Sequence, residues 1–398
     1  MKSLSISILC LFAVFLFYFN DASAADRFFI ERDSSETLAV FVHGFRGSHL
    51  RTWGNFAEYL NKEDCLKKVD FLFWGYPTRL FKKDEKIGSI GEHFKTEFDY
   101  LPKDKYKSMV LIAHSMGGLV VRSFIIQSLI DGKGEELSKI QHIILFGVPN
   151  DGSHIADRFP KDLNVQIDDL KTASRFITDL RKNWIDRVYY ITKNDKYHRQ
   201  IPVTTVVGFD DQIVTEESAK SFFPNTEKTD GDHFTMVKPN NKNHLSYKIV
   251  KTKIIESLPV LYTLMIRTQN SVNDIKGNQN LSKHPQSRSV VTVSLNGSCN
   301  STFKINATRK SMDAGKWVES TFVSLNKCKF TDIKLELGRS PFMIFDDWAF
   351  DRIKIIDKEK NIVDEFGVWS IGDSRRTPDR KKTITIPIRF DSAIECAQ

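Results

Sequence analysis

The chain has 398 residues, a formal net charge of +8 and 5 cysteines. This length suits two domains better than one core, and 41% hydrophobic with 27% charged residues is ordinary for a globular protein. The composition excludes a collagen-like fibre, a disordered tail protein and a disulfide-knot miniprotein, and no repeat indicates a solenoid. The basic balance is compatible with an acidic partner such as anionic lipid, polyanionic glycan or nucleic acid.

Residues 1–24 have the pattern of a secretory signal peptide. Lys2 supplies the positive end, Ile8 to Phe19 is an apolar run too short for a comfortable membrane span, and Ala22-Ser23-Ala24 is a small-residue cleavage site. The alternative is an uncleaved anchor helix. We therefore expect a soluble mature chain that is secreted or periplasmic, with the secretory lumen as a further destination.

Four cysteines remain after removal of the signal, and an even number in an exported chain indicates disulfides. Cys299 and Cys328 lie within one C-terminal segment and are the first candidate pair; the other two are Cys65 and Cys396. Glycosylation sequons occur at Asn280, Asn296, Asn300 and Asn306, and they matter only in a source that glycosylates its exported proteins.

Five apolar runs in the first part of the chain are predicted to be buried strands, at 37–42, 69–74, 108–113, 142–147 and 202–208. Helical spacing separates them, as at 117–130 and at 161–186. Continuous apolar strands alternating with helices indicate an α/β fold, with a mostly parallel sheet covered on both faces.

The pattern changes near residue 267. Residues 268–288 are polar, rich in Asn, Gln and Ser, and are predicted to be a linker. Short alternating runs follow at 290–295, 316–325, 332–337, 351–356 and 383–390, and their spacing predicts a small β-sandwich. The expected organisation is a catalytic domain over 25–267, this linker, and an accessory β-domain over 289–398.

The motif that carries chemistry is Ala113-His114-Ser115-Met116-Gly117. It follows an apolar strand and opens a helix, which is the context of a nucleophile elbow with the pattern G-x-S-x-G. Ala113 replaces the first glycine and is nearly as small. The alternative is an ordinary strand-to-helix turn with a capping serine.

The segment that ends the first mature strand, Phe41-Val42-His43-Gly44-Phe45, lies where such folds place an oxyanion hole. We expect the backbone N–H groups of Phe45 and Met116 to hold the oxyanion, because such donors stabilise charge that appears in the transition state. His43 is interpreted as a structural histidine that anchors this loop.

An acid and a base follow in the order that a triad requires. Asp210 and Asp211 come directly after a strand, and Asp211 is preferred for its spacing to the apolar residues that follow; the alternative is a capping role. His233, in a polar loop, is the candidate general base, and His244 is its rival. The order Ser115, Asp211, His233 is the chain order of α/β-hydrolases.

These residues resemble the lipase-like α/β-hydrolase superfamily, and within it the serine esterase and acylhydrolase group related to the SERAC and PGAP1 proteins. The resemblance spans roughly Leu38 to Pro239, with Asn150 where the group has histidine. It implies hydrolysis of a carboxylic ester, often a lipid or fatty-acyl ester, with no metal or organic cofactor. The departure at Asn150 bears on substrate contacts and leaves the mechanism intact. The matching segments are 42–45 with 52–53, 114–119, 145–153, 214–219 and 233–239.

The C-terminal segments 346–356 and 365–369 resemble the later strands of PLAT-type lipase β-sandwiches, which often approach lipid surfaces. The alternative is a generic β-sandwich that packs its Trp and Phe residues internally.

A second hypothesis is a binding or adhesion protein that uses the β-domain and keeps a vestigial hydrolase fold. Nucleic-acid binding rests on net charge alone, since basic residues are dispersed among acids and no nucleic-acid motif is present. We expect the basic surface to help an esterase meet anionic membranes.

Overall fold

The computed structural model describes residues 27–78, 85–102, 104–160, 163–268, 289–297, 301–307, 317–325, 328–337, 347–356, 361–372 and 383–391. The predicted signal peptide, the predicted linker after residue 268, and Cys10, Cys299 and Cys396 lie outside these residues. The pairing of Cys299 with Cys328 therefore stays a prediction. The chain divides into two compact units between Ser257 and Leu258.

The first unit is built on a seven-stranded sheet with the order β1-β3-β2-β4-β5-β6-β7. The edge strand β1 pairs antiparallel with β3, and every other neighbouring pair is parallel. The strands are β1 (Arg27–Ile30), β2 (Thr37–Val42), β3 (Val69–Trp74), β4 (Ser108–His114), β5 (Ile140–Phe146), β6 (Val203–Gly208) and β7 (Thr226–Thr229). All five predicted strands are present, and the α/β-hydrolase fold is confirmed; β1 and β7 were not predicted.

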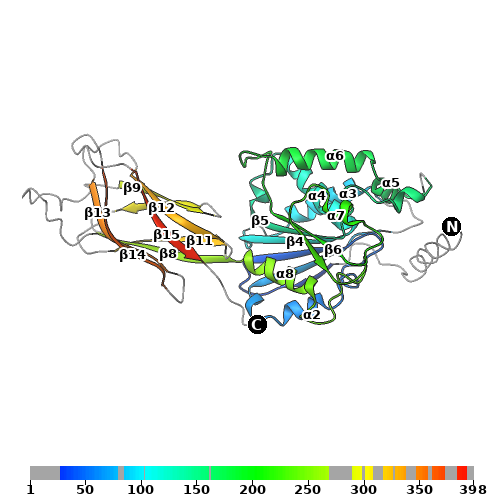
Figure 1. Ribbon diagram of the computed structural model, residues 1–398, viewed down its shortest axis with the longest axis horizontal. Coiled ribbons are helices and arrows are strands. Elements are labelled where there is room, and N and C mark those ends of the chain that lie inside the picture. Colours follow the sequence, from blue (N-terminus) through cyan, green and yellow to red (C-terminus); the bar gives the residue numbers. More distant parts are fainter. Residues whose placement is uncertain are drawn as a thin grey trace, which may run out of the picture. The chain divides into compact units, whose positions relative to one another are not determined.

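Both faces of this sheet are covered, which is why its central strands are apolar throughout. All six residues of β2 are buried. Alternate residues of β2 belong to one large apolar cluster, which also includes residues of α3 (Ile87–Asp99), α4 (Met116–Ile130) and α6 (Arg175–Trp184). Phe41 points to the other face, where its ring contacts those of Trp53 and Phe56. That face carries α2 (Phe56–Asn61) and α8 (Leu245–Glu256) (Figure 1).

The helical stretch predicted over 161–186 is two helices, α5 (Val165–Leu170) and α6. Two side-chain caps explain the break. The carboxamide of Asn164 accepts from the first amides of α5, and the Ser174 hydroxyl accepts from the amide of Ile177 in α6. Between the helices, Ala173 has a φ of +54°, which a continuous helix does not allow. The first unit also contains α7 (Glu216–Lys220), 3-10 turns at Asp64–Leu66, Glu136–Lys139 and Ala156–Arg158, and a π-turn at Ile185–Tyr189.

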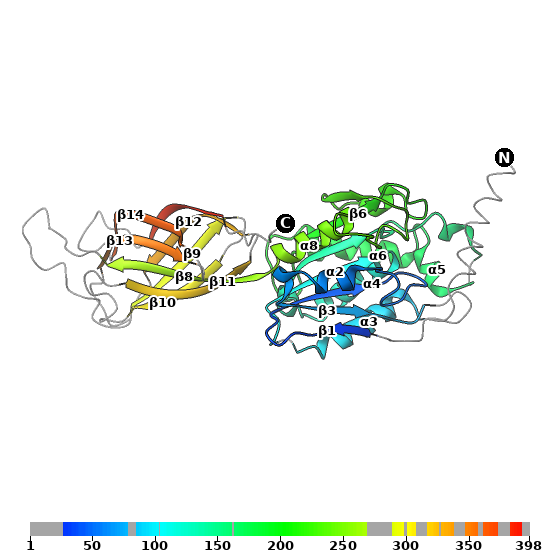
Figure 2. The ribbon, with the colours of Figure 1, turned by 90° about the horizontal axis from the view of Figure 1, so that it is seen from below.

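The second unit consists of two four-stranded antiparallel sheets (Figure 2), with the orders β11-β8-β13-β14 and β10-β9-β12-β15. Apolar side chains from both sheets form one core, which includes Leu264, Val293, Ile333 and Ile353. The strands are β8 (Pro259–Thr268), β9 (Ser289–Gly297), β10 (Ser301–Ala307), β11 (Trp317–Leu325), β12 (Lys329–Leu337), β13 (Asp347–Ile356), β14 (Asn361–Gly372) and β15 (Thr383–Asp391).

The predicted end of the catalytic domain at residue 267 is wrong. Strand β8 pairs with β11 and β13, and its residues Tyr262, Leu264 and Ile266 are buried in the second core. Their alternation has the period of two that marks a strand with one covered face. The first unit therefore ends at Ser257, and the β-domain begins before the polar segment rather than after it.

Four aromatic residues of the second unit are buried in its core: Tyr262, Phe322, Phe330 and Phe350. Trp369 in β14 stacks on Phe350 in β13 with ring centroids 5.6 Å apart. This contact agrees with the generic sandwich considered above. Trp369 is partly buried against the core of the second unit.

Candidate active site

Ser115 lies on a strained turn between β4 and α4. Its φ of +52° and ψ of −130° are unusual for a residue with a side chain. The Ser115 amide donates to the Phe146 carbonyl of β5 at 2.9 Å, which fixes the turn above the sheet. A Cβ on Gly117 would lie 2.2 Å from the carbonyl oxygen of His43, so the close approach of α4 to the end of β2 requires glycine.

The structure brings Ser115, His233 and Asp211 together in one hydrogen-bonded line. His233 Nε2 lies 3.0 Å from Ser115 Oγ, and His233 Nδ1 lies 2.8 Å from Asp211 Oδ2. The carboxylate can only accept, so Nδ1 carries the proton and Nε2 is left to accept from the serine hydroxyl. The side chains of His233 and Asp211 are 4% and 1% exposed, so the pair is shielded from water.

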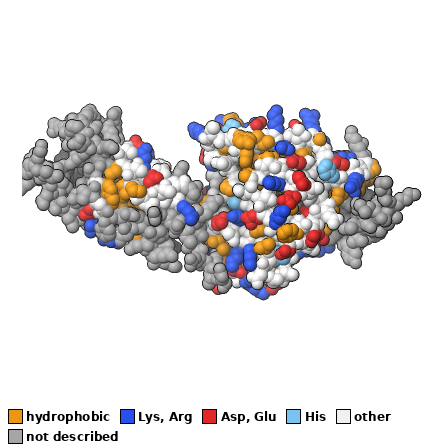
Figure 3. All heavy atoms as spheres, viewed as in Figure 1, with side chains coloured by type: hydrophobic (Ala, Val, Ile, Leu, Met, Phe, Trp, Pro, Cys, Tyr) orange, Lys and Arg blue, Asp and Glu red, His pale blue; other side chains and the backbone are white. Residues whose placement is uncertain are grey.

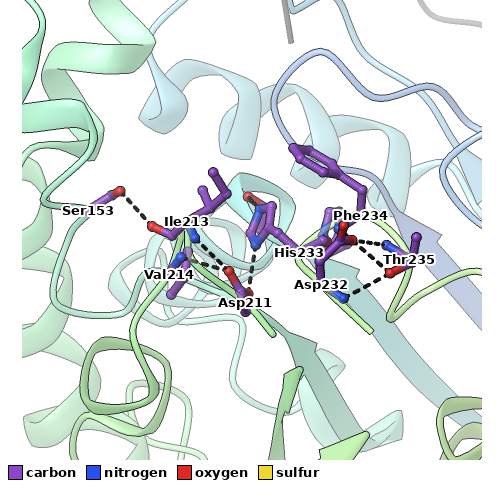
Figure 4. Close-up of polar contacts among 10 residues, drawn as sticks. Ser153, Asp211, Ile213, Val214, Asp232, His233, Phe234 and Thr235 are labelled. Carbon is purple, nitrogen blue, oxygen red and sulfur yellow. Dashed lines mark hydrogen bonds and ion pairs between the residues drawn. The ribbon is translucent and has the colours of Figure 1, made fainter. Parts of the chain in front are cut away.

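Parallel topology explains this meeting. Ser115 follows β4, Asp211 follows β6 and His233 follows β7, and the carboxyl ends of parallel strands lie along one edge of a sheet. Asp211 is held by more than His233. Its Oδ1 accepts from the amides of Ile213 and Val214, both at 2.9 Å (Figure 4).

The rival candidates lie elsewhere. Asp210 is exposed, and Asp211 rather than Asp210 contacts His233. His244 caps α8, where its Nδ1 lies 2.8 Å from the Ser246 hydroxyl. His142 is bonded to the hydroxyl of Thr204, far from the elbow in the sheet register.

The loop that carries His233 is fixed at two points. Asp232 Oδ1 accepts from the amides of Phe234 and Thr235 and from the Thr235 hydroxyl (Figure 4). His114 Nε2 donates to the His233 carbonyl oxygen at 2.7 Å. Burial, reinforced by the neighbouring His233, lowers the pKa of His114 well below its ordinary value, so His114 is neutral.

His43 is the loop anchor that the sequence predicts. Its Nδ1 donates to the Gly44 carbonyl oxygen at 2.9 Å, and its Nε2 accepts from the Tyr76 amide at 3.2 Å. The Tyr76 ring stacks on His43, and its hydroxyl donates to the His43 carbonyl oxygen. Burial lowers the pKa of His43 to about 4. The neutral ring is thus used entirely to shape the loop before Phe45.

Phe45 and Met116 flank the serine. Met116 is the first residue of α4, so its N–H has no acceptor within the helix. Phe45 lines the pocket beside Ser115, next to Gly44, where a Cβ would lie 2.7 Å from the Ser115 Cβ. Both amides therefore belong to segments that border the serine hydroxyl.

A pocket that is open to solvent is lined by Ser115 and His233. One wall is apolar and comes from the segment after β5 and from α5. Phe45 packs against this wall together with Ala156, Phe159, Ile167 and Leu170. The sequence predicts helices near the mouth over 152–200, but the individual lining residues carry no local signal that distinguishes them from core residues.

Asn150 does not line this pocket. It is 1% exposed, its Oδ1 accepts from Arg122 at 2.8 Å, and its Nδ2 donates to the Ala219 carbonyl oxygen. The Arg122 guanidinium is itself buried against the rings of Trp184, Phe222 and Phe223. The expectation that Asn150 bears on substrate contacts is therefore wrong: its side chain holds a buried arginine behind the site.

Three basic residues that sequence reasoning missed also line the pocket: Arg46, Arg51 and Lys238. Their only sequence signal is position, since two follow the oxyanion segment and one follows His233 by five residues. Within the described part of the chain, no group of three or more His, Cys, Asp or Glu side chains could hold a metal ion. The same residues contain no helix long and apolar enough to cross a membrane.

Comparison with known proteins gives one family match. Residues 32–147 match the family model described as "Putative serine esterase (DUF676)". This segment runs from before β2 to the end of β5 and includes Ser115, but neither Asp211 nor His233. No curated protein matches the chain.

Solved structures with some likeness include Bacillus licheniformis lipase BlEst2 in mature form, at 18% identity over 58% of this chain and 99% of that chain, TM-score 0.44. Legionella pneumophila phospholipase PlaB in complex with thio-NAD shares 13% identity over 88% of this chain and 91% of that chain, TM-score 0.41. Paleococcus ferrophilus monoacylglycerol lipase shares 15% identity over 58% of this chain and 99% of that chain, with a TM-score of 0.38. These values are too low to carry an argument about substrate.

The strand order, the elbow and the matched segment define the class of the protein as lipase-like α/β-hydrolase. Its activity is that of a carboxylic ester hydrolase.

Proposed function

We propose that the protein is a secreted serine esterase that cleaves lipid or fatty-acyl esters through a Ser115–His233–Asp211 triad. The observation that supports this most directly is the line of two hydrogen bonds from Ser115 Oγ through His233 to Asp211, at 3.0 and 2.8 Å. A serine with a purely structural role in a turn does not require a buried histidine and carboxylate aligned on its hydroxyl.

In the proposed reaction, His233 Nε2 takes the hydroxyl proton while Ser115 Oγ forms a bond to the ester carbonyl carbon. Asp211 stabilises the imidazolium that results. The tetrahedral intermediate collapses, the alcohol leaves with the proton from His233, and an acyl-enzyme remains. His233 then deprotonates a water that attacks the acyl carbon, and the acid product departs with Ser115 restored.

The proposed oxyanion hole consists of the N–H groups of Phe45 and Met116. The positive end of α4 adds to their effect, because the first amides of a helix point toward charge at its N-terminus. The apolar wall of the pocket suits an acyl chain, which supports a lipid or fatty-acyl ester over a polar one.

Export through the predicted signal, the predicted disulfides and attraction to anionic membranes belong to the same proposal. The face of the first unit in Figure 3 intersperses basic and acidic side chains, so the membrane proposal rests on the net charge of +8. N-terminal sequencing of exported protein should begin at Ala25. Liposome co-sedimentation should rise with anionic-lipid content and fall with salt, and indifference to both would remove the membrane from the proposal.

Replacement of the nucleophile tests the central claim. Ser115→Ala should abolish p-nitrophenol release from short and medium acyl esters and labelling by a fluorophosphonate probe. Ser138→Ala is the matched control, because Ser138 is exposed and lies outside the pocket. Activity retained in folded Ser115→Ala would contradict the triad. Wild-type protein that the probe leaves unlabelled would favour the binding or adhesion alternative.

A further inference from the structure

The pocket that opens onto Ser115 is lined by cations and by no carboxylate. Among its described lining residues are Arg46, Arg51 and Lys238, while neither Asp nor Glu contributes to the lining. In the described part of the chain, no acidic side chain forms an ion pair with Arg51 or Lys238. This contrasts with the surface in Figure 3, where the two signs of charge are mixed.

Arg51 and Lys238 come from segments that touch. A Cβ on Gly54 would lie 3.1 Å from the Lys238 Cβ, so the loop that carries Arg51 packs on the turn that carries Lys238. Arg51 is oriented by the Ser48 hydroxyl, which lies 3.2 Å from its amide and 3.4 Å from its Nε. Lys238 is fixed through its amide, which donates to the Thr235 carbonyl oxygen at 2.9 Å.

Arg46 occupies a backbone position that favours glycine. Its φ is +55°, and its amide donates to the Thr78 hydroxyl at 3.1 Å, while that hydroxyl donates to the Gln166 carboxamide. Glycine adopts this φ without strain, whereas a residue with a side chain adopts it at a conformational cost. Strained residues of this kind cluster where a side chain serves binding or catalysis.

The side of the pocket decides which part of a substrate meets these cations. The alcohol leaves with a proton from His233 Nε2, so it must lie on the His233 side. Lys238 belongs to the turn that His233 begins, and the loop that carries Arg51 packs on this turn through Gly54. The acyl side is instead occupied by the apolar wall with Phe159, Ile167 and Leu170.

We infer that the substrate is an acyl ester whose alcohol portion carries a phosphate, bound by Arg51 and Lys238. This inference rests on the proposed esterase function and adds the chemistry of the leaving alcohol. Cationic side chains bind phosphate through charge-assisted hydrogen bonds, which are stronger than neutral ones. The phosphate is selected at the pocket, not at a membrane surface.

The proposed phosphate site is tested with a pair of esters that differ only in the phosphate. 1-Octanoylglycerol 3-phosphate and 1-octanoylglycerol present the same acyl bond and are compared as monomers, below the concentration at which they aggregate. We expect kcat/KM to be about tenfold higher for the phosphate ester, and this preference to shrink as salt is raised. Arg51→Gln combined with Lys238→Gln should reduce the ratio of the two kcat/KM values to about one. Lys248→Gln, an exposed cation on α8 outside the pocket, is the control that should keep the wild-type ratio.

The outcomes separate the two proposals. Equal hydrolysis of both esters by wild-type protein, or a preference that the double variant retains, would overturn the phosphate site while leaving the esterase intact. Hydrolysis of neither ester, together with absent fluorophosphonate labelling, would overturn the esterase function itself. A loss of the preference in Lys248→Gln would also count against Arg51 and Lys238, since net charge alone would then explain it.

Discussion

At the scale of single residues, His114 fixes the backbone of His233, the proposed general base. Its Nε2 donates to the carbonyl oxygen of His233, while the His233 ring faces Ser115 and Asp211. The lowered pKa of His114 keeps a second positive charge away from the His233 imidazolium of the proposed reaction. We interpret His114 as a positioning residue, because it bonds to the backbone of His233 and not to the reacting atoms.

Replacement of His114 by Phe should therefore lower kcat about tenfold with little change in KM, because the His233 carbonyl loses its donor and the ring loses its alignment. His114→Gln restores an N–H donor and should recover part of the rate. Separate kcat and KM values for a soluble p-nitrophenyl ester, with the rate of fluorophosphonate labelling, are the measurements. A lower melting temperature with unchanged kcat would reduce His114 to a packing role.

At the scale of elements, the elbow depends on how closely α4 approaches β2. A Cβ on Gly117 would meet the carbonyl oxygens of His43 and Val42 at 2.2 and 2.5 Å, and backbone atoms cannot swing away. Gly88 in α3 is the matched opposite. A Cβ there meets only a ring carbon of Phe176, at 3.9 Å.

The two alanine variants should consequently change stability in opposite directions. Gly117→Ala should lower the free energy of unfolding by about 2–4 kcal/mol through overpacking. Gly88→Ala should raise it by about 0.5–1 kcal/mol, because alanine loses less backbone entropy in a helix. Urea unfolding of both variants, with wild type beside them, gives the comparison. A tolerated Gly117→Ala would mean that α4 can shift away from β2.

The same elements show how far the sequence could be interpreted. Strand β2 begins and ends where its apolar run does, and the elbow follows from a strand, small residues and a helix within a few positions. The choice of Asp211 over Asp210 also follows from local spacing, since the amides of Ile213 and Val214 both reach its carboxylate.

What could not be predicted depends on contacts between distant positions. Thr78 bonds to Gln166 across 88 positions, and this contact shapes the loop that bears Arg46. Arg122 and Asn150 meet across 28 positions. Strand β8 pairs with β11 and β13, which lie far along the chain, so no local pattern assigns it to the second unit.

At the scale of the whole molecule, the two units have separate cores and should unfold in separate transitions. The two units differ in the number of histidines that they contain. Of the ten in the chain, nine precede residue 258, and the tenth, His284, lies outside the described residues. The stability of the first unit should therefore respond to protonation near neutral pH more strongly than that of the second.

His43 determines the direction of that response. Its pKa is about 4 in the folded protein and 6.5 as the ordinary value, so between these values the unfolded chain binds a proton that the folded chain excludes. The first unit should lose stability as the pH falls from 6.5 to 4, by about 3 kcal/mol from His43 over the whole window.

Carboxylates act in a different window. Although burial opposes the effect, hydrogen bonds from Lys242, Lys251 and Tyr247 lower the pKa of Glu63 from 4.5 to about 2. The contribution of Glu63 to the free energy of unfolding is present above pH 4.5 and is lost only as the pH falls toward 2. Loss of stability above pH 5 can thus be assigned to buried neutral histidines and not to Glu63.

Calorimetric scans between pH 7.5 and 5 should show the transition of the first unit moving to lower temperature, by about 2–4 °C for each kcal/mol lost. The transition of the second unit should stay nearly fixed. The His43→Gln variant should unfold at a lower temperature than wild type at pH 7.5, but its unfolding temperature should fall less on acidification. The side chain of His154 is 73% exposed, so the control variant His154→Gln should show the same pH dependence as wild type. A His43→Gln profile parallel to wild type would show that another group carries the pH dependence, and joint movement of both transitions would show that the units do not unfold independently.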